Sequence, residues 1–272
     1  MAFGPLVDAA WLRAHLPEPD LRVIDFRWYL VHRDGRDEYR RGHIPGAVFV
    51  DLESVTGSEG GGRHPLPTAR QFAEEMQRAG VSSNTRVVVY DDSAAAPTAT
   101  RLWFLLGLFG HNAQAVLDGG LQAWGAPLET ETQSVERGNF TAAEPDMSRV
   151  VDWQGVRALR GVPVIDARAG ERYRGETEPV DPKAGHIPGA RNLPYTEILA
   201  PDGRFKTPEE LRRQFRSMGV TDGAVFYCGS GVNATQQLLA MELAGLTNAR
   251  LYAGSWSDWS NRDLPVATGS EP

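Results

Sequence analysis

The chain has 272 residues, of which 41% are hydrophobic and 23% charged, the composition of a soluble globular protein of one large or two ordinary domains. A net charge of -7 argues against a nucleic-acid partner, and no apolar run is long enough to cross a bilayer. The first residues lack the basic region and apolar core of a signal peptide. One cysteine excludes an intramolecular disulfide and fits a reducing compartment, so we expect a cytoplasmic protein.

Internal duplication organises the sequence. The run VIDFR at 23–27 returns as VIDAR at 164–168, and GHIPGA at 42–47 returns unchanged at 185–190. Gly110 and Trp124 recur at one common offset as Gly245 and Trp259. A period this long does not describe a solenoid, whose repeats are much shorter. It predicts two domains of one fold, over 1–132 and 148–272, joined by a polar linker at 133–147.

Each half shows the same predicted order of elements. In the first we expect helices at 9–15, 68–79 and 101–108, and strands at 22–26, 86–90 and 115–117. In the second we expect helices at 153–160, 208–218 and 234–243, and strands at 162–167, 224–227 and 249–252. Strands that alternate with helices predict an α/β fold, and their continuous apolar runs predict mostly parallel sheets with helices on both faces.

The only cysteine, Cys228, lies where a strand meets a helix. Gly229 and Gly231 allow a tight turn after the strand, and a helix with Leu238, Leu239 and Leu243 on its buried face follows. Backbone amides of such a loop, together with the helix N-terminus, favour a thiolate over a thiol. We therefore interpret Cys228 as a nucleophile, the alternative being a buried structural cysteine.

The duplication also separates structural residues from catalytic ones. His43 and His186 occur in both copies, as do the pairs Asp25/Arg27 and Asp166/Arg168, whereas the cysteine occurs once. The histidines are therefore expected to support a turn, and the pairs to form internal salt bridges. Trp124, Trp256 and Trp259 are expected in the core. In the first half Asp91 stands near the place of the cysteine, at the start of a loop (91–100) that is longer by two residues, so this half should be catalytically silent.

These motifs resemble the rhodanese superfamily and, more narrowly, its two-domain sulfurtransferases. The resemblance covers nearly the whole chain: HIPGA in each half, the loop CGSGVNA at 228–234, and the tail GSWSDW at 254–259. The CGSGV form is similar to that of the 3-mercaptopyruvate sulfurtransferases. Thiosulfate-preferring rhodaneses usually carry basic residues after the cysteine, where this chain has Gly229 and Ser230.

The resemblance implies roles for particular residues. Cys228 would take sulfur from a donor as a persulfide and pass it to cyanide or a thiol, and the loop amides would stabilise the sulfur anion. Arg172 matches the substrate arginine of the family. A second arginine is often found later in that loop, where this chain is shorter and offers only Lys183. Ser230 and His64 match a proton relay, with Glu53 as its acidic partner; alternatively, His64 is an exposed loop residue. The loop residues expected to bind substrate are Gly229, Gly231, Val232 and Asn233.

The implied partners are a small-molecule sulfur donor and a thiol or cyanide acceptor, with a thioredoxin-like reductant as one further option. No metal or organic cofactor is implied. Thiosulfate is the alternative donor to 3-mercaptopyruvate, and a persulfide carrier for a protein acceptor is an alternative function. Phosphatases of this superfamily need an arginine six places after the cysteine, where this chain has Ala234. Phosphatase activity is therefore disfavoured. A catalytically silent scaffold is disfavoured as well, because the cysteine loop is intact.

Overall fold

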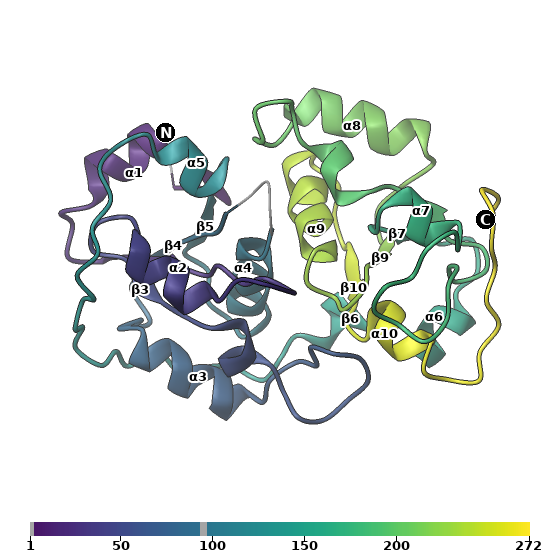
Figure 1. Ribbon diagram of the computed structural model, residues 1–272, viewed down its shortest axis with the longest axis horizontal. Helices are drawn as coiled ribbons and strands as arrows, with labels where there is room; N and C mark the ends of the chain where they lie inside the picture. The colour runs from purple at the N-terminus through teal and green to yellow at the C-terminus, as the bar shows by residue number, and fades with distance from the viewer. Residues whose placement is uncertain (1–2, 93–96) are drawn as a thin grey trace. The chain divides into compact units, whose positions relative to one another are not determined.

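The computed structural model describes residues 3–92 and 97–272, which form two compact units (Figure 1). The first unit contains the chain up to Gly57 together with Pro67–Asp146 and Asp202–Arg204. The second contains Ser58–Leu66, Met147–Pro201 and Phe205–Pro272. The segment Ser58–Leu66, which carries His64, therefore packs with the half that carries the cysteine. Residues 93–96 of the long loop expected after Asp91 lie outside the described residues.

The first unit is a five-stranded sheet with strand order β1-β5-β4-β2-β3, in which every pairing is parallel. Its elements in chain order are β1 (Leu6–Val7), α1 (Ala9–His15), β2 (Leu21–Asp25), α2 (Gly35–Arg41), β3 (Val48–Phe49), η1 (Leu52–Val55), α3 (Ala69–Arg78), β4 (Arg86–Tyr90), α4 (Ala99–Leu108), β5 (Gln114–Leu117) and α5 (Gly120–Trp124).

The second unit repeats this topology with strand order β6-β10-β9-β7-β8, again all parallel. The predicted α/β fold is thereby confirmed. Its elements are η2 (Met147–Arg149), β6 (Val150–Val151), α6 (Trp153–Ala158), β7 (Val164–Asp166), α7 (Gly170–Tyr173), β8 (Arg191–Asn192), η3 (Tyr195–Ile198), α8 (Pro208–Ser217), β9 (Val225–Tyr227), α9 (Ala234–Leu243), β10 (Arg250–Tyr252) and α10 (Ser255–Trp259).

Strand β9 shows why its sequence is a continuous apolar run. Val225 and Tyr227 pack into a cluster with Trp256 and Trp259 on one face of the sheet, while Phe226 meets Phe215 of α8 on the other. All three strand residues are fully buried. Each such side chain removed from water contributes about 1.5–3 kcal/mol, so a strand covered on both faces needs no polar alternation. The prediction that the tryptophans belong to the core is confirmed.

One buried ion-pair network occurs in both units, as the Asp-x-Arg repeat predicts. Arg27 binds Asp25 at 2.7 Å and the carbonyl of Gly42 at 2.8 Å. Arg168 binds Asp166 at 2.6 Å and the carbonyl of Gly185 at 2.7 Å. Because each guanidinium joins the end of a strand to the glycine just before the HIPGA turn, the pair fixes that turn against the sheet.

The histidines of the two turns are structural, as the duplication predicts. His43 stacks on Tyr39 with ring centroids 3.9 Å apart, and its Nδ1 lies 2.8 Å from the Tyr39 carbonyl. His186 repeats both contacts with Tyr173, at 3.8 Å and 2.8 Å. Both side chains are fully buried.

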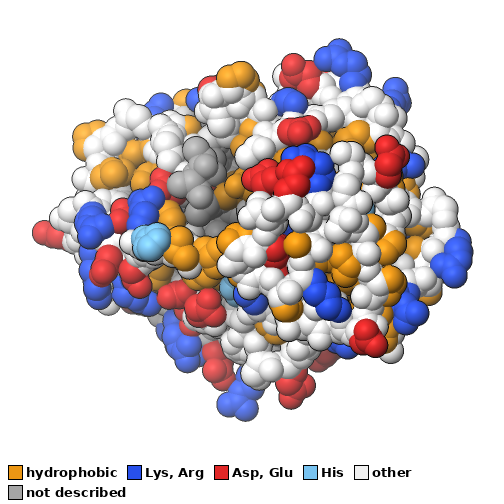
Figure 2. Space-filling view, turned by 45° about the vertical axis from the view of Figure 1, so that its right-hand side comes forward, with side chains coloured by type: hydrophobic (Ala, Val, Ile, Leu, Met, Phe, Trp, Pro, Cys, Tyr) orange, Lys and Arg blue, Asp and Glu red, His pale blue; other side chains and the backbone are white. Residues whose placement is uncertain are grey.

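Charges of both signs are interspersed over the face shown in Figure 2. None of the helices in the described ranges is long and apolar enough to span a membrane. The described residues also contain no cluster of three His, Cys, Asp or Glu side chains able to hold a metal ion.

Candidate active site

Cys228 follows β9 directly and is held by hydrogen bonds to the start of α10. Its amide donates to Ser255 Oγ at 3.2 Å, and its carbonyl accepts from the amide of Trp256 at 2.9 Å. The Gly229 carbonyl accepts from the amide of Ser257 at 2.8 Å. The cysteine is 4% exposed, so its sulfur lies within a fixed and mostly enclosed loop.

Ser255 holds Cys228 from a backbone conformation that serine rarely adopts. Its φ is +54°, and its Oγ also donates to the carbonyl of Tyr252 at 2.9 Å. The offset that relates Gly110 to Gly245 places Gly120 opposite Ser255, and Gly120 has a φ of +58°. A side chain at such a position costs about 1–2 kcal/mol, which glycine avoids. In the unit that carries the cysteine, Ser255 therefore has a strained backbone, and its hydroxyl accepts a hydrogen bond from the Cys228 amide.

Gly231 is required where it stands. Its φ is +78°, and a Cβ there would lie 2.4 Å from the carbonyl oxygen of Ala253. The loop thus approaches the end of β10 more closely than any side chain permits. Gly231 therefore has the unusual backbone angle expected of the loop glycines, whereas Gly229 has no positive φ.

Helix α9 begins without a side-chain cap. Among the described residues, five α-helices have an Asp or Thr side chain that caps their N-terminus, namely α1, α2, α3, α6 and α8. Asn233 stands at that place in α9 and its side chain makes no capping bond. Within the described ranges, the amides of Gly229, Ser230, Val232 and Asn233 donate to no other protein group. Unpaired amides at a helix start attract an anion, so this loop can receive a negatively charged sulfur.

The first unit fills the equivalent place with its own carboxylate. Asp91 follows β4 as Cys228 follows β9, and its Oδ2 accepts from the amides of Thr98 and Ala99 at 2.6 Å each. These amides open α4, which likewise has no cap from its N-cap side chain. A tethered anion therefore occupies the helix start in the copy without a thiol.

The helix after the cysteine is more buried than predicted. Leu238 and Leu239 are buried as expected, but Leu243 is only partly so. Burial instead includes every residue from Ala234 to Met241, polar side chains included. The expectation of one buried face was wrong because neighbouring elements, among them β9, β10, α8 and η3, cover this helix on several sides.

His64 lies against the cysteine loop, and the alternative of an exposed loop histidine is wrong. The side chain is 4% exposed, and its Nδ1 lies 2.9 Å from Ser230 Oγ. The preceding glycines make this possible: a Cβ on Gly61 would overlap the carboxylate of Asp258, and one on Gly62 would lie 2.4 Å from the Gly254 carbonyl. Glu53 lies in η1 of the first unit, where its amide donates to Asp51.

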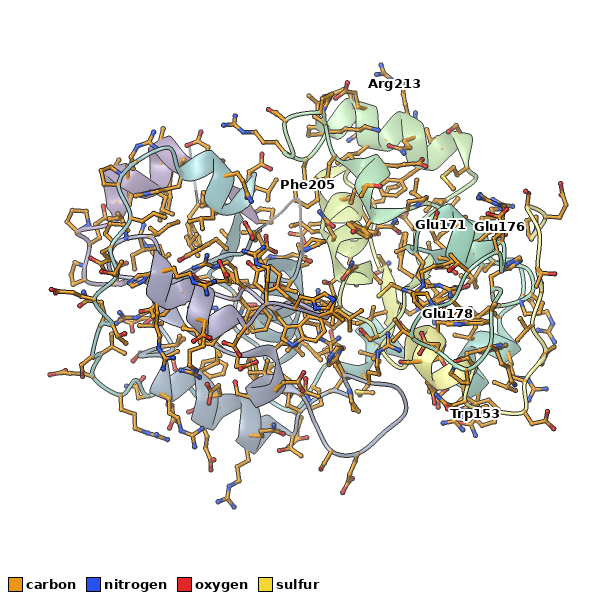
Figure 3. The ribbon with its side chains drawn as sticks, in the orientation of Figure 1. Trp153, Glu171, Glu176, Glu178, Phe205 and Arg213 are labelled. Atoms are coloured by element: carbon orange, nitrogen blue, oxygen red, sulfur yellow. The ribbon has the colours of Figure 1, made fainter. Side chains whose placement is uncertain are left out.

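Arg172 of α7 reaches the same loop. A Cβ on Gly229 would lie 3.5 Å from its Nη1. Its other nitrogens bind Glu178, with Nη2 to Oε1 at 2.6 Å. Figure 3 labels Glu178 together with Glu171 and Glu176 of the same segment; the last two are exposed, whereas the side chain of Glu178 is 3% exposed. Burial raises the pKa of Glu178, but the bonds from Arg172 and two backbone amides outweigh it and hold the pKa below its usual value.

Lys183 is bound to α10 and to the residues that follow it. Its Nζ donates to the carbonyl of Arg262 at 2.5 Å, and its carbonyl accepts from the Trp256 indole at 2.9 Å. The side chain therefore ties the loop before the second HIPGA turn to the end of α10.

Sequence reasoning missed four further residues near the cysteine. Two are the hydroxyl of Ser255 and the phenol of Tyr195, whose pKa is raised by burial and by the charge of Cys228. The others are Arg63 and Asp181. Burial raises the pKa of Asp181, the positive charge of Arg63 lowers it and repulsion from Glu178 raises it, so that the pKa stays above its usual value. For Arg63, the run of glycines before it was an available signal, since it marks close packing against another backbone.

Arg63 lines two hollows of the second unit. One, of about 420 Å³, is formed by Arg63, Glu178, Pro179, Val180, Asp181, Pro182 and Asn261. The other, of about 380 Å³, is formed by Gly61, Gly62, Arg63, Ser257, Asp258, Asn261 and Arg262. Either has room for a three-carbon acid.

The family model of the rhodanese-like domain matches residues 8–127 and 152–262 of this chain. A Pseudomonas aeruginosa protein with the provisional name 3-mercaptopyruvate sulfurtransferase is 43% identical over 99% of this chain and all of its own. Mycobacterium tuberculosis SseB, provisionally named a thiosulfate sulfurtransferase, is 39% identical over 97% of both chains. The crystal structure of SseA from Escherichia coli, described as a 3-mercaptopyruvate sulfotransferase, matches with a TM-score of 0.82 at 34% identity, over 93% of this chain and 99% of that one.

Proposed function

The chain belongs to the rhodanese family and is a sulfurtransferase, and from this we propose that it moves sulfur from 3-mercaptopyruvate to cyanide or a thiol through a persulfide on Cys228. The observation that carries the proposal is the uncapped loop of unpaired amides around the only thiol. These amides match a sulfur anion both before and after it has gained a second sulfur.

The proposed reaction has two steps. The Cys228 thiolate attacks the donor sulfur; the carbon–sulfur bond breaks with its electron pair on carbon, leaving the persulfide and the enolate of pyruvate. The enolate then takes a proton. In the second step the acceptor attacks the outer sulfur, the sulfur–sulfur bond breaks, and the thiolate returns. Covalent catalysis of this kind replaces one difficult transfer with two easier ones.

We assign the proton of the first step to the His64–Ser230 pair. Their 2.9 Å contact places a histidine, the side chain best suited to proton transfer near neutral pH, beside the loop. Thiosulfate needs no such proton, because its leaving group is the stable anion sulfite. The pair should therefore matter for one donor and not for the other.

His64→Gln should lower kcat with 3-mercaptopyruvate about 100-fold, the usual worth of a positioned acid or base. With thiosulfate, kcat should change by less than about 3-fold, since the persulfide step is otherwise intact. Steady-state rates with cyanide as acceptor measure both. Equal losses with the two donors would mean that His64 only shapes the loop.

The whole proposal is tested by the mass of the intact protein after incubation with 3-mercaptopyruvate. We expect a gain of one sulfur atom, which cyanide then removes as thiocyanate. Retention of the original mass with every donor would defeat the proposal.

Thiosulfate is the second candidate donor, and SseB of Mycobacterium tuberculosis supports it by name. The form of the loop favours 3-mercaptopyruvate, because Gly229 and Ser230 stand where thiosulfate-preferring rhodaneses usually carry basic residues. A kcat/KM for thiosulfate far above that for 3-mercaptopyruvate would reverse the order of the two donors.

A persulfide carrier would react slowly with cyanide and rapidly with one protein acceptor. A thioredoxin-like protein is the first acceptor to test. A free catalytic thiol suits a reducing compartment such as the cytoplasm.

A further inference from the structure

The two HIPGA turns are held by the same backbone contacts. In the first unit, His43 and Glu129 exchange two backbone hydrogen bonds, at 2.9 and 3.0 Å. In the second unit, His186 and Ala267 exchange the same two bonds, at 2.8 and 3.0 Å. Glu129 and Ala267 therefore occupy equivalent positions of the repeat, and only the first of them has a carboxylate.

That carboxylate closes the turn of the first unit. Its Oε1 accepts from the amide of Gly46 at 2.6 Å and lies 3.4 Å from Nε2 of His43. The second unit has no such group at its turn: within the described residues, the amide of Gly189 donates no hydrogen bond, and Nε2 of the fully buried His186 has no partner. A buried polar atom without a partner costs free energy unless a ligand supplies one.

The C-terminal tail does not supply the missing carboxylate. Glu271 is the only acid after Ala267, and it is exposed and accepts no hydrogen bond from the described residues. Its charge acts instead on Tyr173, whose pKa is raised by burial and, in addition, by the charges of Asp166 and Glu271. Gly189 is exposed, and a Cβ there would meet no atom within 4 Å, so the turn is open to a ligand.

A pocket of about 330 Å³ lies beside Gly189. Its wall is mainly apolar, formed by α6 and the turn after it, by the residues that lead into β7 and by Trp259 of α10. Arg157 and Arg160 add two positive charges, and none of the described residues that line the pocket is acidic. Because β7 and β9 are parallel, the residues before β7 and Cys228 after β9 lie at opposite ends of the sheet. The pocket is therefore separate from the site of the cysteine.

We propose that the second HIPGA turn binds the carboxylate of a small organic acid, which takes the place that Glu129 occupies in the first unit. One carboxylate oxygen accepts from the amide of Gly189 beside Nε2 of His186, and the apolar part of the acid fills the pocket. Arg157 and Arg160 favour an anion over a neutral molecule, because a positive surface raises the local concentration of anions. The volume is at the small end of ligand sites and suits an acid of about four to six carbon atoms. This site does not depend on the proposed sulfur chemistry.

Isothermal titration calorimetry with 4-methylpentanoate tests the proposal, with the neutral 4-methylpentanamide as the matched probe. The wild-type protein should bind the amide at least about 10-fold more weakly than the acid, the usual worth of a hydrogen bond to a charged group. Ala267→Glu supplies the carboxylate from within the chain, as in the first unit, and should weaken binding of the acid at least about 10-fold. Ser270→Glu is the control: it adds the same charge at an exposed position of the same segment and should keep the affinity within about 3-fold.

Three outcomes would overturn the proposal. The first is a wild-type protein that binds no acid at millimolar concentrations, and the second is equal affinity for the acid and the amide. The third is unchanged affinity in Ala267→Glu, which would place the acid elsewhere in the protein, for instance against Arg172. If Ala267→Glu does not fold, Arg160→Met replaces it: this variant leaves the turn intact and should weaken the acid at least about 3-fold and not the amide. An unchanged preference for the acid in Arg160→Met would then count against the site.

Discussion

Cys228→Ser should abolish sulfur transfer, with kcat/KM falling by about four orders of magnitude or more for any donor. A serine hydroxyl cannot form a persulfide, and no other described residue is a thiol. The exchange is nearly isosteric, and the backbone contacts of residue 228 to Ser255 and Trp256 do not involve its side chain. The loop should therefore keep its shape.

Two measurements check this prediction together. Thiocyanate formation should be lost, and the intact mass of the variant should not change on exposure to 3-mercaptopyruvate. Urea unfolding should match that of the wild-type protein, which shows that chemistry and not folding has been removed. Residual turnover above one per cent of the wild-type rate would mean that sulfur reaches the acceptor without Cys228.

Asp166→Ala should destabilise the protein by about 3–5 kcal/mol, the usual cost of removing one partner of a buried ion pair. Arg168 is 1% exposed and would keep Glu178 and the Gly185 carbonyl as partners, yet lose its shortest contact. Its guanidinium also lies 4.5 Å from the ring centre of Trp256, whose amide holds the carbonyl of Cys228. A loss of stability here should therefore be accompanied by a loss of activity.

Urea unfolding followed by tryptophan fluorescence measures the effect. The control is Glu176→Ala, which breaks an ion pair in the same unit whose carboxylate is 57% exposed. That variant should lose less than about 0.5 kcal/mol, since solvent-exposed pairs contribute little. A cost for Asp166→Ala below 1 kcal/mol would contradict the view that this pair fixes the HIPGA turn.

The fold could be predicted because its signals are local and occur twice. Thr207 and Glu210 form the capping box of α8, with Pro208 at its first position, and all three residues lie within four consecutive positions. The repeated Asp-x-Arg pair and the HIPGA histidines were assigned correctly because the copy without a cysteine serves as an internal control. Short edge strands such as β3 and β8, of two residues each, carry too few side chains to show a pattern.

The site was only partly predictable because its contacts are distant in sequence. Cys228 and its loop form one continuous motif, and the resemblance supplied His64, which the structure places against Ser230. Arg63 and Asp181 are 118 residues apart, and no local pattern links a charge in a glycine-rich segment to an acid before the second HIPGA turn. Lys183 was the predicted second cation because it alone was near in sequence. Ser255 could have been found, since the repeat places it opposite a glycine.

Because of Asp91, the folding free energies of the two repeats depend differently on a bound anion. Its carboxylate is covalently part of the chain, so its local concentration at the amides of Thr98 and Ala99 does not depend on what the solution contains. Among the described residues, no carboxylate of the chain binds the amides of Gly229, Ser230, Val232 and Asn233, so the sulfur's charge or a bound acid can take this place. A ligand that binds only the folded state stabilises it, so occupancy of the second repeat is coupled to its folding free energy, while the first repeat contributes a constant. Sulfur loading and resistance to unfolding are thereby linked, and the linkage is confined to half of the molecule.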